Sequence, residues 1–305
     1  MAASAIVQTH NLTKTYEGIH RVDQVHLQVE EGEIYGFLGP NGAGKTTTLK
    51  MLLGLVKPSK GDIEIFGKSL KRHRSTILQR TGSLIESPSY YGHLTGLENM
   101  KVMQRLRNVP DQNVEEALRI VRLENQKNKK AEQYSLGMKQ RLGIAMSLLA
   151  FPKLLILDEP TNGLDPAGIG GIRELIKSLP KRYGMTVLIS SHLLSEIDQI
   201  ATSVGIISEG KLLFQGSMAS LRKKGNTSIY IKTGDNAKAE QLFLSKGYRS
   251  VQDGSRLKVG YLDDTEIAEM NRLLVEHHIP VTRIEEHKKS VEDIFLELTG
   301  RERSL

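Results

Sequence analysis

The segment "GPNGAGKT", residues 39–46, limits what this chain can fold into more than any other stretch. It fits the pattern G-x-x-x-x-G-K-[ST] and stands between an apolar run, "EIYGFL", and a helical pattern that starts near residue 45. Gly42 and Gly44 let backbone N–H groups turn inward around phosphate oxygens, and the start of the helix adds its positive dipole end. The sequence therefore predicts a strand–loop–helix unit that binds the phosphates of a nucleotide.

Two side chains of this loop have predictable roles. Lys45 should reach the β- and γ-phosphates of ATP, and Thr46 should bind Mg²⁺ through its hydroxyl. A glycine-rich turn with a chance lysine is the competing interpretation, but a strand and a helix flank the motif as a nucleotide site requires. We expect the nucleotide-binding residues of the loop to be Gly39, Pro40, Asn41, Gly42, Ala43, Gly44, Lys45, Thr46 and Thr47.

An acidic motif follows an apolar run farther along the chain. The segment "LLILDEP", residues 154–160, places Asp158 and Glu159 where a buried strand ends, which is the edge at which α/β sheets bind ligands. Asp158 can hold the Mg²⁺ ion, and Glu159 can polarise a water molecule for in-line attack on the γ-phosphate. A solvated strand-to-loop turn would explain the two acids alone, but together with the phosphate loop they favour a catalytic interpretation.

The order of the elements indicates an α/β fold. The apolar runs "LLIL", "TVLIS" and "VGIIS" are separated by helical patterns, which implies a largely parallel sheet with both faces covered. Before them, Thr95 and Glu98 form a capping-box pattern for a helix that should end before Pro110, and a second helix is expected over residues 114–123. A third helix is indicated by the apolar face of Leu142, Ala145, Met146 and Leu149.

The last quarter of the chain has a different organisation. The polar segment "LRKKGNT", residues 221–227, predicts a linker after a first domain of residues 1–220. Residues 228–305 alternate strand and helix patterns in an order close to a β-α-β-β-α-β unit followed by one helix. This predicts a small C-terminal α+β domain, which carries no recognisable chemical motif and could regulate the protein or help it to dimerise.

Three further motifs complete an ordered set. The segment "YSLGMKQRL", residues 134–142, lies between the phosphate loop and "LDEP"; Ser135 is placed to cap a helix, and Gly137 leaves the first turn open to an anion. A purely structural capping serine is the competing interpretation. Downstream follow "NGLDP", residues 162–166, and "SH", residues 191–192.

These five motifs, in this order and spacing, resemble the nucleotide-binding subunit of ABC transporters over roughly the first two-thirds of the chain. The resemblance implies an ABC-type P-loop NTPase domain that takes ATP and Mg²⁺ and drives a separate integral-membrane permease subunit. In that family two such domains close head to tail, so that each ATP lies between one phosphate loop and the opposite signature segment. The chain is therefore expected to form a homodimer.

The same resemblance implies roles for individual residues. Ser135 and Gly137 would contact the γ-phosphate held by the other copy, Asp165 would lie at the dimer interface, and His192 would lie near the γ-phosphate. Tyr16 matches the aromatic residue that stacks on adenine, with an ordinary surface tyrosine as the other interpretation. The signature usually reads Leu-Ser-Gly-Gly, whereas this chain has Tyr134 and Leu136 in place of the leucine and the first glycine.

Glu86 occupies the position at which most members of the family carry a glutamine that senses Mg²⁺ and the attacking water. It would join the catalytic core to a helical subdomain over about residues 87–150, and its carboxylate could take part in catalysis and in the metal shell. Tyr90 and Tyr91 follow on the loop that faces the membrane subunit in the family. Together with the long C-terminal extension, Glu86 makes the chain similar to the subgroup that exports bacitracin and lantibiotics.

Composition narrows the remaining classes. The net charge of 42 − 35 = +7 selects no particular anionic partner, and the absence of cysteine excludes disulfides and thiolate metal sites. No apolar run approaches the ~20 residues of a membrane-spanning helix, so a membrane role is expected to come through a partner, at the cytoplasmic face of the cell membrane.

The basic runs 68–74 and 127–130 lack interleaved aromatic residues, so no nucleic-acid binding is expected. His277, His278 and His287 show no ligand pattern, and no metal beyond Mg²⁺ is expected.

Two other classes of protein remain open at this point. A soluble ABC-type ATPase that acts on ribosomes or DNA would usually carry two fused nucleotide domains or a long coiled coil, and neither is present. A phosphate-loop GTPase or kinase is the other class. A GTPase would need an Asn-Lys-x-Asp motif, whereas Asn128-Lys129 is followed by Lys130-Ala131.

Overall fold

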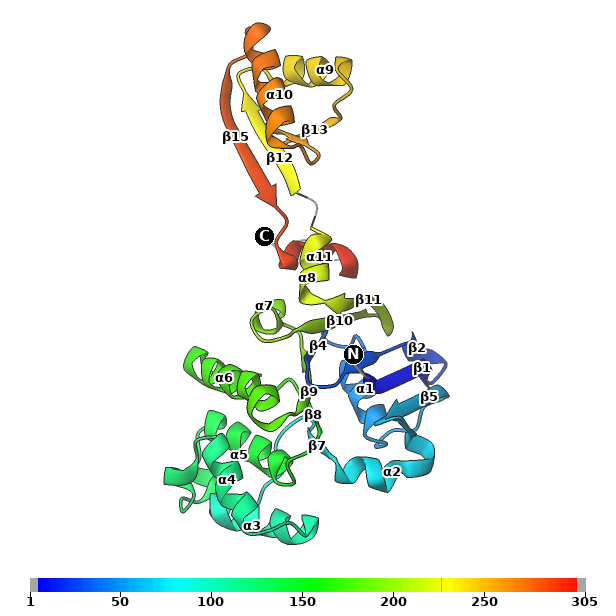
Figure 1. Cartoon of the computed structure of the whole chain (residues 1–305), viewed down its shortest axis with the longest axis vertical. Coiled ribbons are helices and arrows are strands. Elements are labelled where there is room, and N and C mark those ends of the chain that lie inside the picture. The colour runs from blue at the N-terminus through cyan, green and yellow to red at the C-terminus, as the bar shows by residue number, and fades with distance from the viewer. Residues whose placement is uncertain (1–4, 226, 301–305) are drawn as a thin grey trace. The chain divides into compact units, whose positions relative to one another are not determined.

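The computed structural model describes residues 5–225 and 227–300 (Figure 1). The chain divides into two compact units, residues 1–218 and residues 219–305. The first unit carries the motifs described above.

The sheet that positions these motifs has six strands in the order β11-β10-β4-β9-β8-β7. All of them run parallel except β11, which pairs antiparallel with β10. Strands β4, β9 and β8 are adjacent and buried along their whole length, as near-continuous apolar runs in a covered parallel sheet should be. Their carboxyl ends therefore meet at one edge. The bounds are β4 (Ile34–Leu38), β7 (Thr81–Leu84), β8 (Leu154–Asp158), β9 (Thr186–Ser191), β10 (Ser203–Ser208) and β11 (Lys211–Ser217).

A second sheet is antiparallel and lies on the other side of helix α1 (Lys45–Leu52). Its order is β2-β1-β5-β6, with β3 also paired to β1. Leu49 of α1, Ile65 of β5 and Phe37 of β4 belong to one buried apolar cluster, so α1 joins the two sheets through a common core. The bounds are β1 (Ala5–Tyr16), β2 (Ile19–Val25), β3 (Gln28–Glu30), β5 (Lys60–Ile65) and β6 (Lys68–Ser69).

Residues 87–150 are mainly helical. The predicted capping box is confirmed: the Glu98 N–H donates to Thr95 Oγ1 at 3.1 Å, and the Thr95 N–H donates to Glu98 Oε2 at 2.7 Å. The helix that it starts ends before Pro110, as predicted, because Asn108 turns into the left-handed conformation. The bounds are α3 (Gly96–Arg107), α4 (Gln112–Ile120), α5 (Leu136–Leu148) and the short 3₁₀ helices η1 (Glu124–Gln126) and η2 (Ala131–Gln133).

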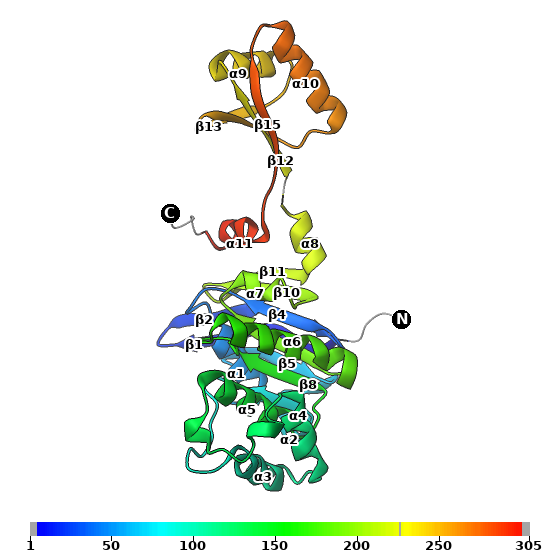
Figure 2. The same cartoon turned by 90° about the vertical axis from the view of Figure 1, so that its left-hand side faces the viewer.

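The apolar face predicted for the third helix is confirmed in α5. Leu142, Ala145 and Leu149 are fully buried, while Met146 is half-buried. The long helix α6 (Pro166–Tyr183) lies next to α5 in both Figure 1 and Figure 2. The remaining helices of this unit are α2 (Leu70–Gln79) and the short α7 (Leu194–Ile197).

The second unit has the predicted β-α-β-β-α-β order followed by one helix. Its four strands form an antiparallel sheet in the order β13-β14-β12-β15, and α9 and α10 cover one face of it (Figure 2). Ile231, Phe243 and Met270 meet in its core. The bounds are α8 (Met218–Lys223), β12 (Thr227–Thr233), α9 (Asn236–Ser245), β13 (Ser250–Asp253), β14 (Arg256–Val259), α10 (Asp264–Glu276), β15 (Val281–Lys288) and α11 (Val291–Thr299).

The linker predicted over residues 221–227 differs from the observed structure, since residues 218–223 form α8. The reason is that Leu221 is fully buried and so packs as part of a folded element. The polar composition of the segment predicted a linker and gave no sign that this one leucine would be buried.

None of the helices within residues 5–225 and 227–300 is long and apolar enough to cross a membrane.

Candidate active site

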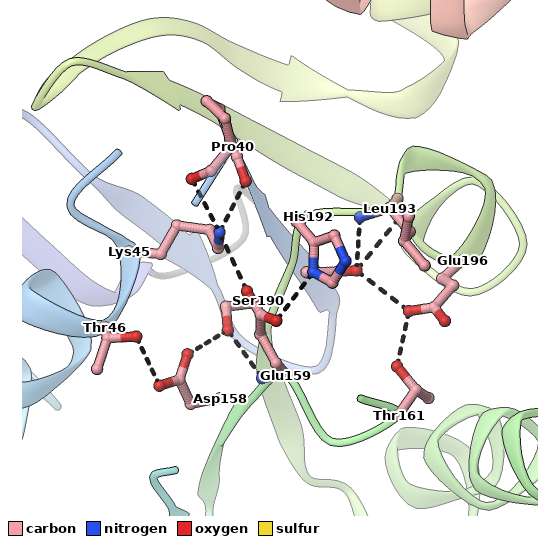
Figure 3. Close-up of polar contacts among 12 residues, drawn as sticks. Pro40, Lys45, Thr46, Asp158, Glu159, Thr161, Ser190, His192, Leu193 and Glu196 are labelled. Carbon is pink, nitrogen blue, oxygen red and sulfur yellow. Dashed lines mark hydrogen bonds and ion pairs between the residues drawn. The ribbon is translucent and has the colours of Figure 1, made fainter. Parts of the chain in front are cut away.

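The phosphate loop connects β4 to α1 and encloses the side chain of its own lysine. Gly42 and Gly44 have φ values of +79° and +105°, in the left-handed region that glycine adopts without strain. The Lys45 side chain is only 5% exposed. Its Nζ donates to the carbonyl oxygens of Gly39 at 2.7 Å and Pro40 at 3.2 Å, as Figure 3 shows.

Thr46 and Asp158 meet at the end of β8, as the two motifs predicted. Thr46 Oγ1 donates to Asp158 Oδ2 at 2.8 Å, and Ser190 Oγ donates to Asp158 Oδ1 at 2.5 Å (Figure 3). Asp158 and Ser190 are partners in the register of β8 and β9, which explains why the serine reaches the carboxylate. The converging hydroxyl and carboxylate oxygens of Thr46 and Asp158 are the hard ligands that Mg²⁺ takes, so these residues fit the ion.

Glu159 is held by three neighbours. Its Oε1 lies 3.1 Å from Lys45 Nζ, and its Oε2 lies 2.9 Å from His192 Nδ1 (Figure 3). Its own N–H donates to Ser190 Oγ at 3.0 Å. The backbone of Glu159 has a φ of +45°, a conformation that costs an L-residue free energy and here turns its carboxylate toward the phosphate loop.

A buried acid that the sequence motifs did not include supports this arrangement. Glu196 of α7 is 8% exposed, and its Oε2 accepts from Thr161 Oγ1 at 2.7 Å and from Ser191 Oγ at 3.1 Å. These bonds connect the segment after Glu159 to the segment that carries His192. An acid four residues after a "SH" motif in a short helix was the available signal, and its burial was not visible in the sequence.

Tyr16 and the phosphate loop line one cavity of about 360 Å³, together with Asn41, Gly42, Gly44, Lys45, Thr46, Thr47 and Glu159. The Tyr16 ring is 45% exposed, and Lys14 Nζ lies 4.7 Å from its centroid. Arg21 of β2 also lines this cavity and was not predicted from the sequence. Ala43 is buried beneath the loop, and its N–H donates to the Pro40 carbonyl at 3.2 Å.

The other predicted residues lie at two helix starts. Ser135 caps α5 by accepting from the Met138 N–H at 3.3 Å, and Asp165 caps α6 by accepting from the Gly168 N–H at 3.0 Å. Gly137 follows in the first turn of α5. Ser135 and Asp165 are exposed, and none of the three lines the cavity around Lys45. Within one chain the structure therefore does not bring them to the phosphate loop.

Tyr134 and Leu136, the two departures in the signature, have different surroundings. Tyr134 is buried and its hydroxyl donates to the Gln126 carbonyl at 2.7 Å, so it packs as part of the subdomain core. Burial raises the pKa of the Tyr134 hydroxyl. Leu136 is 53% exposed beside Gly163 of the "NGLDP" motif.

Glu86 pairs with a lysine of the helix that follows the phosphate loop. Its Oε1 lies 2.6 Å from Lys50 Nζ, and its side chain is 65% exposed. Its φ of +62° again places a non-glycine residue in the left-handed region. The metal role predicted for Glu86 remains a prediction.

A cavity of about 390 Å³ follows Glu86 along the chain. Tyr90 and Tyr91 line it with apolar side chains of α3 and α5, among them Leu106 and Met146. Tyr91 is 56% exposed and Leu106 is 75% exposed, so much apolar surface here faces solvent.

Comparison with known proteins finds relatives of one family, which agrees with the motifs and the fold. Residues 22–162 match the family described as ABC transporter. The bacitracin transport ATP-binding protein BcrA of Bacillus licheniformis is 45% identical over 302 residues, covering 97% of this chain and 98% of that protein. The lantibiotic transport ATP-binding protein SrtF of Streptococcus pyogenes is 44% identical over 210 residues, covering 69% of this chain and 90% of that protein.

Solved structures with a similar fold belong to the same family. An ATP-binding subunit of an ABC transporter is 29% identical with a TM-score of 0.65, covering 72% of this chain and 92% of that one. A dimeric ATP-binding cassette in a post-hydrolysis state, bound to ADP and Pi, is 26% identical with a TM-score of 0.63, covering 70% of this chain and 98% of that one. By its motifs, its fold and these relatives, the chain belongs to the ATP-binding subunits of the ABC transporter family.

Proposed function

We propose that this protein binds and hydrolyses ATP with Mg²⁺ as a head-to-tail homodimer and drives a separate membrane subunit that exports a peptide antibiotic of the bacitracin or lantibiotic class. The observation that carries the proposal is the position of Glu159, whose carboxylate is held between Lys45 and His192 beside the Thr46–Asp158 pair.

Lys45 and the loop amides bind the phosphates in this mechanism. The ammonium of Lys45 is already desolvated by burial and bound by oxygens, so phosphate oxygens can replace the Glu159 carboxylate without a further desolvation cost for the lysine. Thr46 and Asp158 would hold Mg²⁺, which when bound neutralises charge on the β- and γ-phosphates. Ser190 keeps the Asp158 carboxylate oriented.

Glu159 orients the attacking water. Once Lys45 turns to phosphate, Glu159 keeps its bond to His192 and has a free oxygen to accept a proton from water. The Glu196 bonds to Thr161 and Ser191 keep the acid and the histidine at this spacing. His192 then remains close to the site of the γ-phosphate.

The location of Ser135, Gly137 and Asp165 supports dimerisation. They lie at two helix starts outside the cavity of their own phosphate loop, so we expect a second copy to supply them to the γ-phosphate. Contacts to the γ-phosphate across the interface would close the dimer, and hydrolysis would open it. The dimeric cassette among the solved relatives supports this arrangement.

The membrane subunit would dock on the surface around Tyr90 and Tyr91. This surface is apolar, exposed and directly follows Glu86, so movement at the nucleotide can reach it through a few residues. Residues 1–220 would act as the nucleotide-binding domain, with residues 87–150 as its helical subdomain, and residues 228–305 as an accessory domain. The protein would then work at the cytoplasmic face of the cell membrane.

The relatives favour export of a peptide antibiotic over action on ribosomes or DNA, since the named ones are transport proteins for bacitracin and a lantibiotic. The test is to express the chain with the membrane protein encoded beside it in a sensitive bacterium. Cells that make the wild-type chain should grow at a higher concentration of bacitracin or of a lantibiotic than cells without it. Cells that make Glu159→Gln at an equal protein level should remain as sensitive as cells without the chain. If the variant protects the cells, or if the wild type protects them against neither antibiotic class, the export assignment is overturned.

A further inference from the structure

A polar cavity of about 270 Å³ lies between α4, α5 and α6, away from the phosphate loop. Both views of the fold show these three helices grouped together (Figures 1 and 2). Four guanidinium groups line the cavity: Arg119, Arg122, Arg141 and Arg182. No motif in the sequence pointed to this cluster, and the ATPase mechanism does not use it.

The acids around the cavity do not balance these charges. Glu116 pairs with Arg119 at 2.5 Å and accepts from the Tyr183 hydroxyl at 3.0 Å. Glu174 pairs with Lys177 at 3.2 Å. Three arginines that line the cavity, Arg122, Arg141 and Arg182, therefore have no carboxylate partner within the described stretches 5–225 and 227–300.

Arg141 is fixed in place and faces a like charge. Its Nη1 donates to the Val121 carbonyl at 2.8 Å, and its other terminal nitrogen lies so close to Gly171 that a Cβ there would clash with it. Burial lowers the pKa of Arg141, and the positive charge of Arg122 lowers it further. A bound anion would offset the repulsion between the two guanidinium groups, because it supplies the missing counter-charge.

Arg122 stands at a position that favours glycine. It follows the end of α4 with a φ of +59°, in the left-handed region that favours glycine. The chain instead carries a long cation here, directed to the same cavity as Arg141 and Arg182. A non-glycine residue in a strained conformation beside a cluster of unpaired charges is typical of a binding site.

We propose that this cavity binds a small phosphate-like oxyanion through Arg122, Arg141 and Arg182. Guanidinium groups bind such anions with paired N–H donors, and the volume suits phosphate or pyrophosphate better than a whole nucleotide. The anion would tie α4 and α5 to α6. Since α5 and α6 begin at Ser135 and Asp165, its binding would fix the relative position of the two helix starts.

The test uses the full chain, saturated with ADP in EDTA so that the phosphate loop is filled, and inorganic pyrophosphate as the probe in calorimetry. The wild type should bind one pyrophosphate, and both Arg122→Gly and Arg182→Gln should weaken this binding at least tenfold. Arg122→Gly places glycine in the left-handed conformation that it favours, so this substitution should preserve the fold. Lys181→Gln is the matched control, since it removes a cation next to Arg182 that does not line the cavity.

The control should bind within twofold of the wild type. No binding to the wild type would overturn the proposal, and so would equal weakening by Lys181→Gln and Arg122→Gly. The test does not depend on transport or on hydrolysis, so its outcome is independent of the proposed function.

Discussion

Lys45 and Glu159 form a largely buried ion pair, with Nζ 3.1 Å from Oε1, between the two motifs that the ATPase reaction needs most. The pair keeps the lysine desolvated and the acid aimed at the phosphate loop. In the proposed mechanism the pair also links two roles, because the lysine would leave the acid to bind phosphate, and the acid would then be free to accept a proton from water.

Replacing Glu159 by glutamine should preserve ATP binding and remove turnover. Glutamine keeps the shape of the side chain but cannot accept a proton, and general-base catalysis contributes about 10²–10⁴-fold to rate. Steady-state phosphate release and ATP affinity should be measured on the same preparation. Near-normal hydrolysis by this variant would show that Glu159 is not the general base.

Ser190→Ala should slow hydrolysis about tenfold with little change in ATP affinity. The substitution removes the hydroxyl that donates to Asp158 and accepts from the Glu159 N–H, and each such bond contributes about 1 kcal/mol. Ser178→Ala is a suitable control, because that hydroxyl donates within α6, to the Leu175 carbonyl, and contacts neither acid. Equal rates for the two variants would show that Ser190 does not position the acids.

The free energy of unfolding should fall at alkaline pH partly because of Tyr35. Burial, and then the charge of Glu33, raise the pKa of Tyr35 well above its usual value of about 10. Above that pH the unfolded chain releases a proton that the folded chain still holds, so stability falls as pH rises. In Tyr35→Phe the decline between about pH 9 and pH 11 should be shallower. Denaturant titrations at several pH values measure this, and parallel curves for both proteins would contradict it.

Glu86→Ala should change the free energy of unfolding by less than about 1 kcal/mol, because the ion pair with Lys50 is exposed. Its effect should appear in coupling, with less transport for each ATP hydrolysed by the complex reconstituted with its membrane subunit, since alanine has no polar group to face the nucleotide. Lys50→Gln removes the same ion pair and keeps the acid, so it separates the effect of the pair from that of the carboxylate. Unchanged coupling in Glu86→Ala would show that the acid has no part in it.

The parts of the site that lie directly after a strand in the sequence could be predicted from the sequence. The phosphate loop and the "LDEP" segment each follow an apolar strand directly, and parallel strands end at one edge, so the meeting of Thr46 with Asp158 follows from the pattern. Ser190 and Glu196 were not predictable, because their contacts depend on which strands are neighbours and in what register.

In the rest of the molecule, too, short-range patterns were predictable and contacts between distant segments were not. The capping box of α3 and the order of the C-terminal elements were visible, since both rest on short-range patterns. The pairing of Lys50 with Glu86 and the arginine cluster around Arg141 join residues that only the packing of separate helices brings together. The helical start of the predicted linker was missed because one buried side chain, Leu221, decides it.

Closure of two copies around ATP is tested by the oligomeric state of Glu159→Gln saturated with Mg-ATP, measured by light scattering coupled to size-exclusion chromatography. A dimer should form with ATP, be absent with ADP, and be lost when Ser135→Arg is added to block the signature segment. A strictly monomeric protein, both alone and together with its membrane subunit, would contradict it.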